Sequence, residues 1–319
     1  MLLVIALAIC DLCFGSVNLF LVSKSDPLFS TILYDIRLPK TITSIIAGSS
    51  LAICGLLLQS LFRNPLAGPY VLGVSSGASL FVAIATMVLT TANISGVFFV
   101  GKGVITLFSI AGAFFVTLII LAISKKTKSN VTILLVGLML SQILAATEGL
   151  IEYLSSADRL KTFVMWSMGS VGSTTLSDVV LIAPLCALVI GYSFSLIRPM
   201  NAILLNEQYA QNLGINIHKL RVSVIVITSV LVGVITAFCG PIAFVGISVP
   251  IASRLFFKTS HHLHQMVFCI LLGASVLLVA DIICQVISHQ FTLPVNTVTT
   301  LIGSPVVIYL LFKSKLNIG

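Results

Sequence analysis

Long apolar runs, separated by short polar stretches, follow one another along this whole chain. Each is close to the length that crosses the hydrocarbon core of a bilayer, about 20 residues. Ten runs are read, at residues 1–22, 41–62, 70–91, 104–124, 131–151, 176–197, 222–240, 241–256, 266–287 and 295–312. They are apolar on all sides and do not alternate as barrel strands do, so they are predicted to be helices. The pattern predicts an all-α membrane protein of about ten transmembrane helices, with a single domain over residues 1–319.

Two of these boundaries are unusual. Gly240 and Pro241 mark a break between the seventh run and the short eighth one, with almost no loop. The first run is weak as a span because Asp11 interrupts it and residues 15–18 are polar. A cleaved signal peptide normally opens with a basic region, which this sequence lacks, so an anchored first helix is favoured.

Composition and charge agree with a membrane location. Apolar residues make up 58% of the chain and charged residues 8%, whereas soluble domains carry about a quarter charged residues. The formal net charge is +8, but the basic residues lie between apolar runs and form no single stripe, so no nucleic-acid partner is expected. If the N-terminus is cytoplasmic, eleven of the 17 lysines and arginines fall in inner loops. This bias predicts that both termini are cytoplasmic.

Residues typical of catalysis or metal binding are sparse. Cys10 and Cys13 form a C-x-x-C pair, but all seven cysteines lie in or beside apolar runs, and the pair is interpreted as two small helix residues. His261, His262 and His264 are zinc-type ligands whose spacing fits no standard site. The sequence contains no nucleotide-binding P-loop, no serine–histidine–acid pattern and no H-E-x-x-H. We therefore expect no enzyme activity, no metal and no cofactor bound by this chain.

Asp281 is the acid placed deepest in a strongly apolar run. A charge at a helix centre costs about 2.5–3.5 kcal/mol on insertion scales, so this residue needs a polar partner or a proton. Gln285, one turn further on, is a candidate partner. Such an acid serves ion-driven transport in some proteins and holds helices together in others, and both interpretations stay open.

Two further features concern packing and partners. Gly48, Ala52 and Gly55 have the small-residue spacing that lets helix backbones approach closely. The polar stretch 206–214 is rich in helix formers and ends in Gly214, so it predicts a short helix outside the bilayer. That helix is either a connector or a docking surface for a cytosolic partner.

Between Arg37 and Leu80 the sequence reads RLPKTITSIIAGSSLAICGLLLQSLFRNPLAGPYVLGVSSGASL. This ordered pattern resembles the signature of the FecCD family, the permeases of ABC importers for iron–siderophores, haem and cobalamin. Three later blocks agree with the same family: RPMNAILLNEQYAQNLGINIHKLR with its coupling loop, GPIAFVGISVPIASRLF with its G-x-I-x-F-V-G block, and LPVNTVTTLIGSPVVIYLL with its last helix. Together the blocks cover nearly the whole chain beyond residue 30.

The resemblance implies a type II ABC importer permease fold in the bacterial inner membrane. It implies a second permease subunit, with a homodimer expected, and two cytosolic ATPase subunits that carry the ATP and Mg. A periplasmic substrate-binding protein would complete the importer. ATPase docking is expected in a cytoplasmic coupling loop at about 199–221.

The same resemblance assigns roles to nine positions. It implies that the binding protein docks at Arg37 and Lys40. The ATPase coupling site would comprise Glu207, Ala210, Leu213 and Gly214. The cytoplasmic gate would comprise Asn64, Leu66 and Asn130.

The sequence departs from the family pattern at two places. The P-H pair of the third block is Pro250-Ile251, and the arginine that some members use in docking is Gln285. Iron–siderophore is ranked first as the cargo because it is the commonest family substrate, with cobalamin and haem as alternatives. A secondary transporter driven by an ion gradient through Asp281 is the rival from another class.

Overall fold

The computed structural model describes residues 1–13, 27–88, 102–124, 126, 130–287 and 293–315. Every regular element in these ranges is a helix. In chain order the helices are α1 (Leu2–Cys13), α2 (Pro27–Ser30), η1 (Thr31–Arg37), α3 (Leu38–Leu61), α4 (Val74–Ala83), η2 (Ile84–Val88), α5 (Lys102–Ser124), α6 (Asn130–Tyr153), α7 (Ala157–Ser167), α8 (Leu176–Ser193), η3 (Phe194–Leu196), α9 (Ile197–Leu205), α10 (Glu207–Asn212), α11 (Ile217–Cys239), α12 (Val245–Phe257), α13 (His262–Val286) and α14 (Val295–Lys315).

The apolar helices match the ten predicted runs. Within the described residues, six helices are long and apolar enough to cross a membrane, and four shorter ones correspond to the first, third, eighth and tenth runs. The first predicted run reached residue 22, but α1 ends at Cys13 and residues 14–22 lie outside the described ranges. The third run begins with a turn and the eighth with an irregular stretch, so their helices start later than predicted, at Val74 and Val245.

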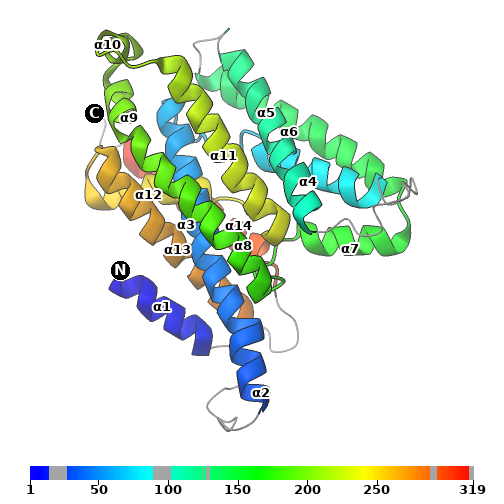
Figure 1. The fold of residues 1–319 in the computed structure, drawn as a ribbon. Helices are drawn as coiled ribbons and strands as arrows, with labels where there is room; N and C mark the ends of the chain where they lie inside the picture. The colour runs from blue at the N-terminus through cyan, green and yellow to red at the C-terminus, as the bar shows by residue number, and fades with distance from the viewer. Residues whose placement is uncertain (14–26, 89–101, 125, 127–129, 288–292, 316–319) are drawn as a thin grey trace.

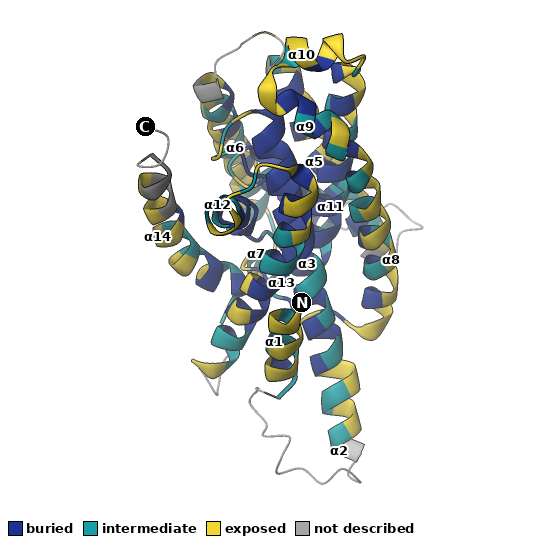
Figure 2. Ribbon diagram, turned by 90° about the vertical axis from the view of Figure 1, so that its left-hand side faces the viewer, coloured by how far each residue is buried: buried dark blue, intermediate teal, exposed yellow. Residues whose placement is uncertain are grey.

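The helix α3 forms the centre of the bundle. It packs against α13, α12, α11 and α8. In the span Leu28–Leu61, which includes α3, 83% of the most apolar stretch is buried. Figure 2 shows this central position, with α3 and α11 dark blue and the outer helices largely yellow. Only 17% of the most apolar part of the span Thr132–Tyr153 (α6) is buried, and only 22% of that of the span Leu176–Leu205, which includes α8. These two spans therefore face outwards.

Glycines set the close helix crossings around α3. A Cβ atom on Gly48 would overlap the backbone of Gly273 in α13, and one on Gly55 would overlap the backbone of Gly246 in α12. Ala52 lies at the crossing of α3 and α13, because a Cβ atom added to Gly273 would lie 2.8 Å from the Cβ of Ala52. The small-residue spacing read from the sequence therefore marks two close backbone contacts of the central helix.

The predicted break between the seventh and eighth runs is confirmed. Gly240 has φ +72° and follows the last residue of α11. The chain then crosses to α12 through a short irregular stretch, where the Ala243 N–H donates to Oδ1 of Asn296 at 3.0 Å. A left-handed backbone at this point favours glycine, because an L side chain is strained there.

Figure 1 shows that the bundle has two distinct ends. The helices α9 and α10 lie at the end that we call the α10 end, and α2 lies at the opposite α2 end, with α7 towards it. The helix α7 lies between the fifth and sixth predicted runs, outside both. Trp166 of α7 donates its indole N–H to the carbonyl of Ala237 at 3.2 Å, which fixes α7 on α11.

Candidate functional site

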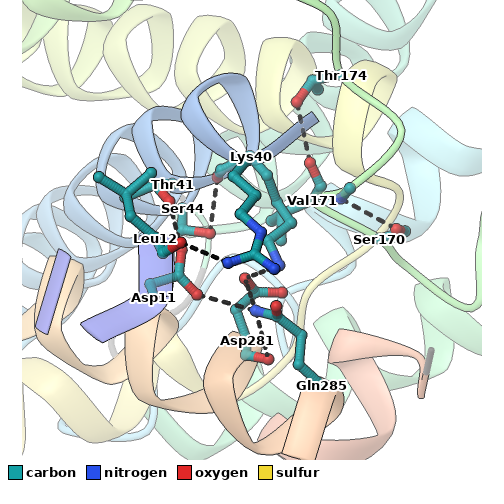
Figure 3. Close-up of polar contacts among 12 residues, drawn as sticks. Asp11, Leu12, Lys40, Thr41, Ser44, Ser170, Val171, Thr174, Asp281 and Gln285 are labelled. Carbon is teal, nitrogen blue, oxygen red and sulfur yellow. Dashed lines mark hydrogen bonds and ion pairs between the residues drawn. The ribbon is translucent and has the colours of Figure 1, made fainter. Parts of the chain in front are cut away.

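A buried ionic network lies towards the α2 end, where α1, α3 and α13 meet (Figure 3). Nζ of Lys40 is 2.8 Å from Oδ2 of Asp281. Nε2 of Gln285 donates to Asp281 and to Asp11, both at 3.0 Å. Thr41 donates its hydroxyl to the other oxygen of Asp11 at 2.5 Å. Both carboxylates therefore have partners on neighbouring helices.

Arg37 extends this network to the end of α1. Its NH1 group donates to the carbonyl oxygens of Leu12, at 2.6 Å, and Cys13, at 2.9 Å. These carbonyls belong to the last turn of α1, where a helix leaves its acceptors unsatisfied and where a positive charge is favourable. The arginine therefore caps α1 and holds it against the start of α3.

The burial of these groups corrects one premise of the sequence interpretation. The docking role that the family resemblance implies for Arg37 and Lys40 requires accessible side chains, but the two residues are only 4% and 8% exposed. Their charges are used inside the chain, with Asp11 at 0% and Asp281 at 3% exposed. A docking role for the two cations stays a prediction. The pairing of Gln285 with Asp281 is confirmed, whereas Lys40 was not foreseen as a partner.

The chain reverses at the α10 end through two locally capped helices. Oδ1 of Asn206 accepts the N–H of Gln208 at the start of α10, and Oδ1 of Asn216 accepts the N–H of Lys219 at the start of α11. Gly214 between them has φ +78°. The short polar helix and its glycine ending are thus as the sequence predicted.

The four predicted coupling residues have different environments. Ala210 lies on the inner face of α10 and is fully buried, whereas Leu213, just after the helix, is 58% exposed. Glu207 is tied to α11 by an ion pair with Arg221 at 2.8 Å. Tyr209, which the sequence interpretation did not select, is 47% exposed beside Leu213. Two large apolar side chains therefore project from a helix that lies outside the apolar spans.

The predicted gate residues Asn64 and Leu66 lie in the turn that follows α3. Oδ1 of Asn64 accepts the N–H of Leu66 at 2.9 Å, which folds the turn on itself. Arg63 has φ +48° and donates to the carbonyl of Ile203, so the turn is fastened to α9. Asn130 begins α6, but its side chain lies outside the described residues, so its predicted place at a gate is untested.

The three histidines lie in two different environments: the rings of His261 and His264 meet edge to face with centroids 5.4 Å apart, whereas His262 points into the bundle. His262 is 2% exposed and lies between Asn201 and Ser60, with contacts of 2.9 and 2.8 Å. His261 caps the start of α13, where its ring nitrogen accepts the N–H of Leu263. Within the described ranges no group of three or more histidine, cysteine or acidic residues is arranged to hold a metal ion.

Comparisons with known proteins agree with this architecture. The model of the FecCD transport family matches residues 2–313. The Vitamin B12 import system permease protein BtuC of Shigella boydii serotype 18 is 33% identical over 305 residues, covering 96% of this chain and 91% of its own length. The protein of the same name from Escherichia coli O9:H4 is 34% identical and covers 88% of this chain and 84% of its own.

Solved structures show the same fold. A structure described as an inward-facing conformation of a transporter assigned to the metal-chelate ABC type is 28% identical, with a TM-score of 0.83 and coverage of 98% of this chain and 97% of its own. PsaBC from Streptococcus pneumoniae in complex with Fab, at 12% identity and a TM-score of 0.58, shares the fold alone. The family match over nearly every residue decides the assignment: this chain belongs to the FecCD transport family and is a multi-pass membrane transport subunit that is not itself an enzyme.

Proposed function

We propose that this chain is the permease subunit of an ATP-driven importer of a bulky metal chelate in the bacterial inner membrane. The observation that carries the proposal is the FecCD match over residues 2–313. Cobalamin, itself a cobalt chelate, is the first cargo to test because the curated relatives are vitamin B12 permeases. The iron–siderophore preference drawn from the sequence is not confirmed, and ferric siderophores become the second cargo to test.

The α10 end is proposed as the docking site of an ATPase subunit, so that the two permease subunits of the importer would hold two ATPase subunits. Tyr209 and Leu213 project from it as exposed apolar side chains, and such side chains gain free energy when a partner covers them. Local caps at Asn206 and Asn216 hold the helix in place, so a partner would meet a preformed surface.

A chain of contacts connects this docking site to the proposed gate. The carbonyl of Ile203 in α9 holds Arg63, which adjoins Asn64 in the turn after α3. Movement of α10 by an ATPase would reach α9 directly, since the two helices pack together. We propose that this route transmits ATP-driven motion to the turn that carries Asn64 and Leu66.

The remaining partners follow from the same assignment. A second, identical permease subunit would cover part of the outward-facing apolar surface, of which α6 and α8 are the least buried helices. A substrate-binding protein would dock at the α2 end, which is then periplasmic. Because Arg37 and Lys40 are buried there, docking by these two residues requires the network to open.

The ionic network also weighs against the rival ion-gradient mechanism. Asp281 is held by Lys40 and Gln285, which favours a structural role over a proton or sodium site. A carboxylate already paired with a lysine has less need of a transported cation.

The test is uptake into proteoliposomes that contain this chain, an ABC ATPase and a substrate-binding protein of the same organism. Labelled cyanocobalamin and a labelled ferric siderophore are offered separately, with ATP or a non-hydrolysable analogue. The proposal expects uptake of one of them only with ATP. Uptake driven by a proton or sodium gradient into vesicles that hold this chain alone would contradict it.

A further inference from the structure

A cavity of about 480 Å³ with several polar side chains on its walls lies at the α10 end, between α3, α9, α12 and α13. The residues on its walls include Arg63 and Arg254, the amides of Gln59 and Gln265, and Asn64 of the proposed gate. No aspartate or glutamate among the described residues lines it. Two guanidinium groups therefore share one cavity without a carboxylate.

Arg254 is the unusual member of this lining. It is partly buried in the last turn of α12, and within the described ranges its guanidinium group has no hydrogen bond or ion pair with the protein. Keeping a guanidinium away from bulk water without a partner is costly. Its planar set of five N–H donors matches a phosphate group, which it can bind through two parallel hydrogen bonds.

Two buried acceptors in the same cavity also lack partners. Gln59 and Gln265 are 2% and 1% exposed, and neither side-chain oxygen accepts a hydrogen bond from a described residue. The oxygen of each amide is identified, because Nε2 of Gln59 donates to the carbonyl of Ile247 at 3.2 Å and Nε2 of Gln265 donates to that of Thr259 at 2.6 Å. Both residues line the cavity, but their side-chain oxygens are covered by protein atoms. A ligand that satisfies these oxygens must therefore bring donors as well as anionic oxygens, and the two side chains must turn towards it.

The cavity wall is held in place by His262. Its backbone N–H donates to Oδ1 of Asn201 at 2.8 Å, which identifies that atom as an oxygen. The ring Nδ1 must then donate to the same oxygen, and Nε2 accepts from the Ser60 hydroxyl. These contacts tie α3, α9 and α13 together, so the cavity is a preformed site.

We propose that this cavity binds a phosphate-bearing ligand that also carries hydrogen-bond donors. A phosphatidylethanolamine headgroup and free hydrogen phosphate share this chemistry. The phosphate would pair with Arg254, and the donors would reach the side-chain oxygens of Gln59 and Gln265 once these side chains turn towards the ligand. Because Asn64 lines the same cavity, an occupant would also brace the turn after α3. The inference goes beyond the proposed transport function and does not depend on the cargo.

The test measures ligand binding by the purified full chain in detergent, using isothermal titration calorimetry. The probes are dihexanoyl phosphatidylethanolamine, dihexanoyl phosphatidylcholine and inorganic phosphate. Phosphatidylcholine serves as the headgroup control because its quaternary ammonium has no N–H to donate. Binding of phosphatidylethanolamine alone identifies a lipid ligand, whereas competition by inorganic phosphate at similar affinity identifies a free phosphate site.

Arg254→Gln should weaken binding of the preferred probe by about tenfold or more, since it removes charge-assisted hydrogen bonds. The matched control is Arg198→Gln, because Arg198 is exposed on α9 outside the cavity and its loss should leave binding unchanged. A second variant, Gln265→Glu, places a carboxylate in the cavity and should also abolish binding, even if Arg254→Gln does not fold.

Three results would overturn the proposal. One is a wild-type chain that binds neither phosphatidylethanolamine nor phosphate. Another is equal affinity for phosphatidylethanolamine and phosphatidylcholine together with no binding of phosphate. The third is unchanged binding in a folded Arg254→Gln or Gln265→Glu variant.

Discussion

The two ends of this bundle treat polar side chains in opposite ways. At the α2 end, Asp11, Lys40 and Asp281 are buried and satisfied by one another and by neighbouring helices. At the α10 end, Asn206 and Asn216 cap their own helices within a few residues, while Tyr209 and Leu213 remain exposed. The charges at the α2 end are paired within the chain, and we propose that the exposed side chains at the α10 end are covered by a partner.

The contrast separates stability from function. A buried network contributes to folding only while every member is paired, because one missing partner leaves an uncompensated charge. An exposed apolar side chain outside the membrane contributes little to folding but gains free energy when a partner covers it. Substitutions at the α2 end should therefore unfold the chain, and substitutions at the α10 end should leave a folded but uncoupled permease.

Lys40→Met should have the largest effect on stability. It leaves the carboxylate of Asp281 buried without its cation, and breaking a buried pair in this way costs about 3–5 kcal/mol. The measurement is the thermal unfolding midpoint of the purified chain in detergent. The control is Arg221→Met at the α10 end, where the pair with Glu207 is partly exposed and its loss should cost less than about 1 kcal/mol.

The double variant Lys40→Met with Asp281→Leu sharpens this comparison. It removes both charges, so most of the lost stability should return. Equal losses in Lys40→Met and Arg221→Met would show that the two ends do not differ as described.

Gln285→Leu should have the next largest effect. It removes the donor that joins Asp281 to Asp11, and hydrogen bonds to charged groups contribute about 1.5–3 kcal/mol. Hydrogen exchange should speed up in α1, because this contact fastens α1 to α13. Gln208→Leu, on the exposed face of α10, should leave exchange in α1 unchanged. Unaltered protection of α1 in Gln285→Leu would remove the glutamine from the network.

Gly214→Ala should have the smallest effect on stability. The left-handed backbone at this residue, φ +78°, penalises an L side chain by about 1–2 kcal/mol. The matched control is Gly191→Ala in α8, where the added Cβ meets no atom within 4 Å and a helical backbone favours alanine. The unfolding midpoint should fall in the first variant and hold or rise in the second. A rise in both would mean that the turn after α10 tolerates another conformation.

The features that the sequence could predict are local or periodic. Ten apolar runs, the Gly240 break, the short polar helix before Gly214 and the pairing of Gln285 with Asp281 all depend on residues within a few positions. Helix spacing brings residues i and i+4 together, so this last pairing needs no knowledge of the fold.

The features that it missed are long-range. Lys40 meets Asp281, and Arg37 meets the end of α1, only because α1, α3 and α13 pack together. The two basic residues look like surface charges in the sequence because they precede an apolar run. The close approach of α3 and α13 at Gly48 and Gly273 turns that position into a buried one.

The most direct test of the coupling claim compares two exposed leucines at opposite ends. Leu213→Gln changes the proposed docking surface, and Leu154→Gln changes a leucine that is 75% exposed beyond the end of α6. Both are reconstituted with the ATPase and the binding protein, and uptake is measured together with ATP hydrolysis in the same proteoliposomes. The account predicts that Leu213→Gln loses ATP-driven uptake while keeping the wild-type unfolding midpoint, and that Leu154→Gln keeps both. Full uptake per ATP hydrolysed in Leu213→Gln would contradict it.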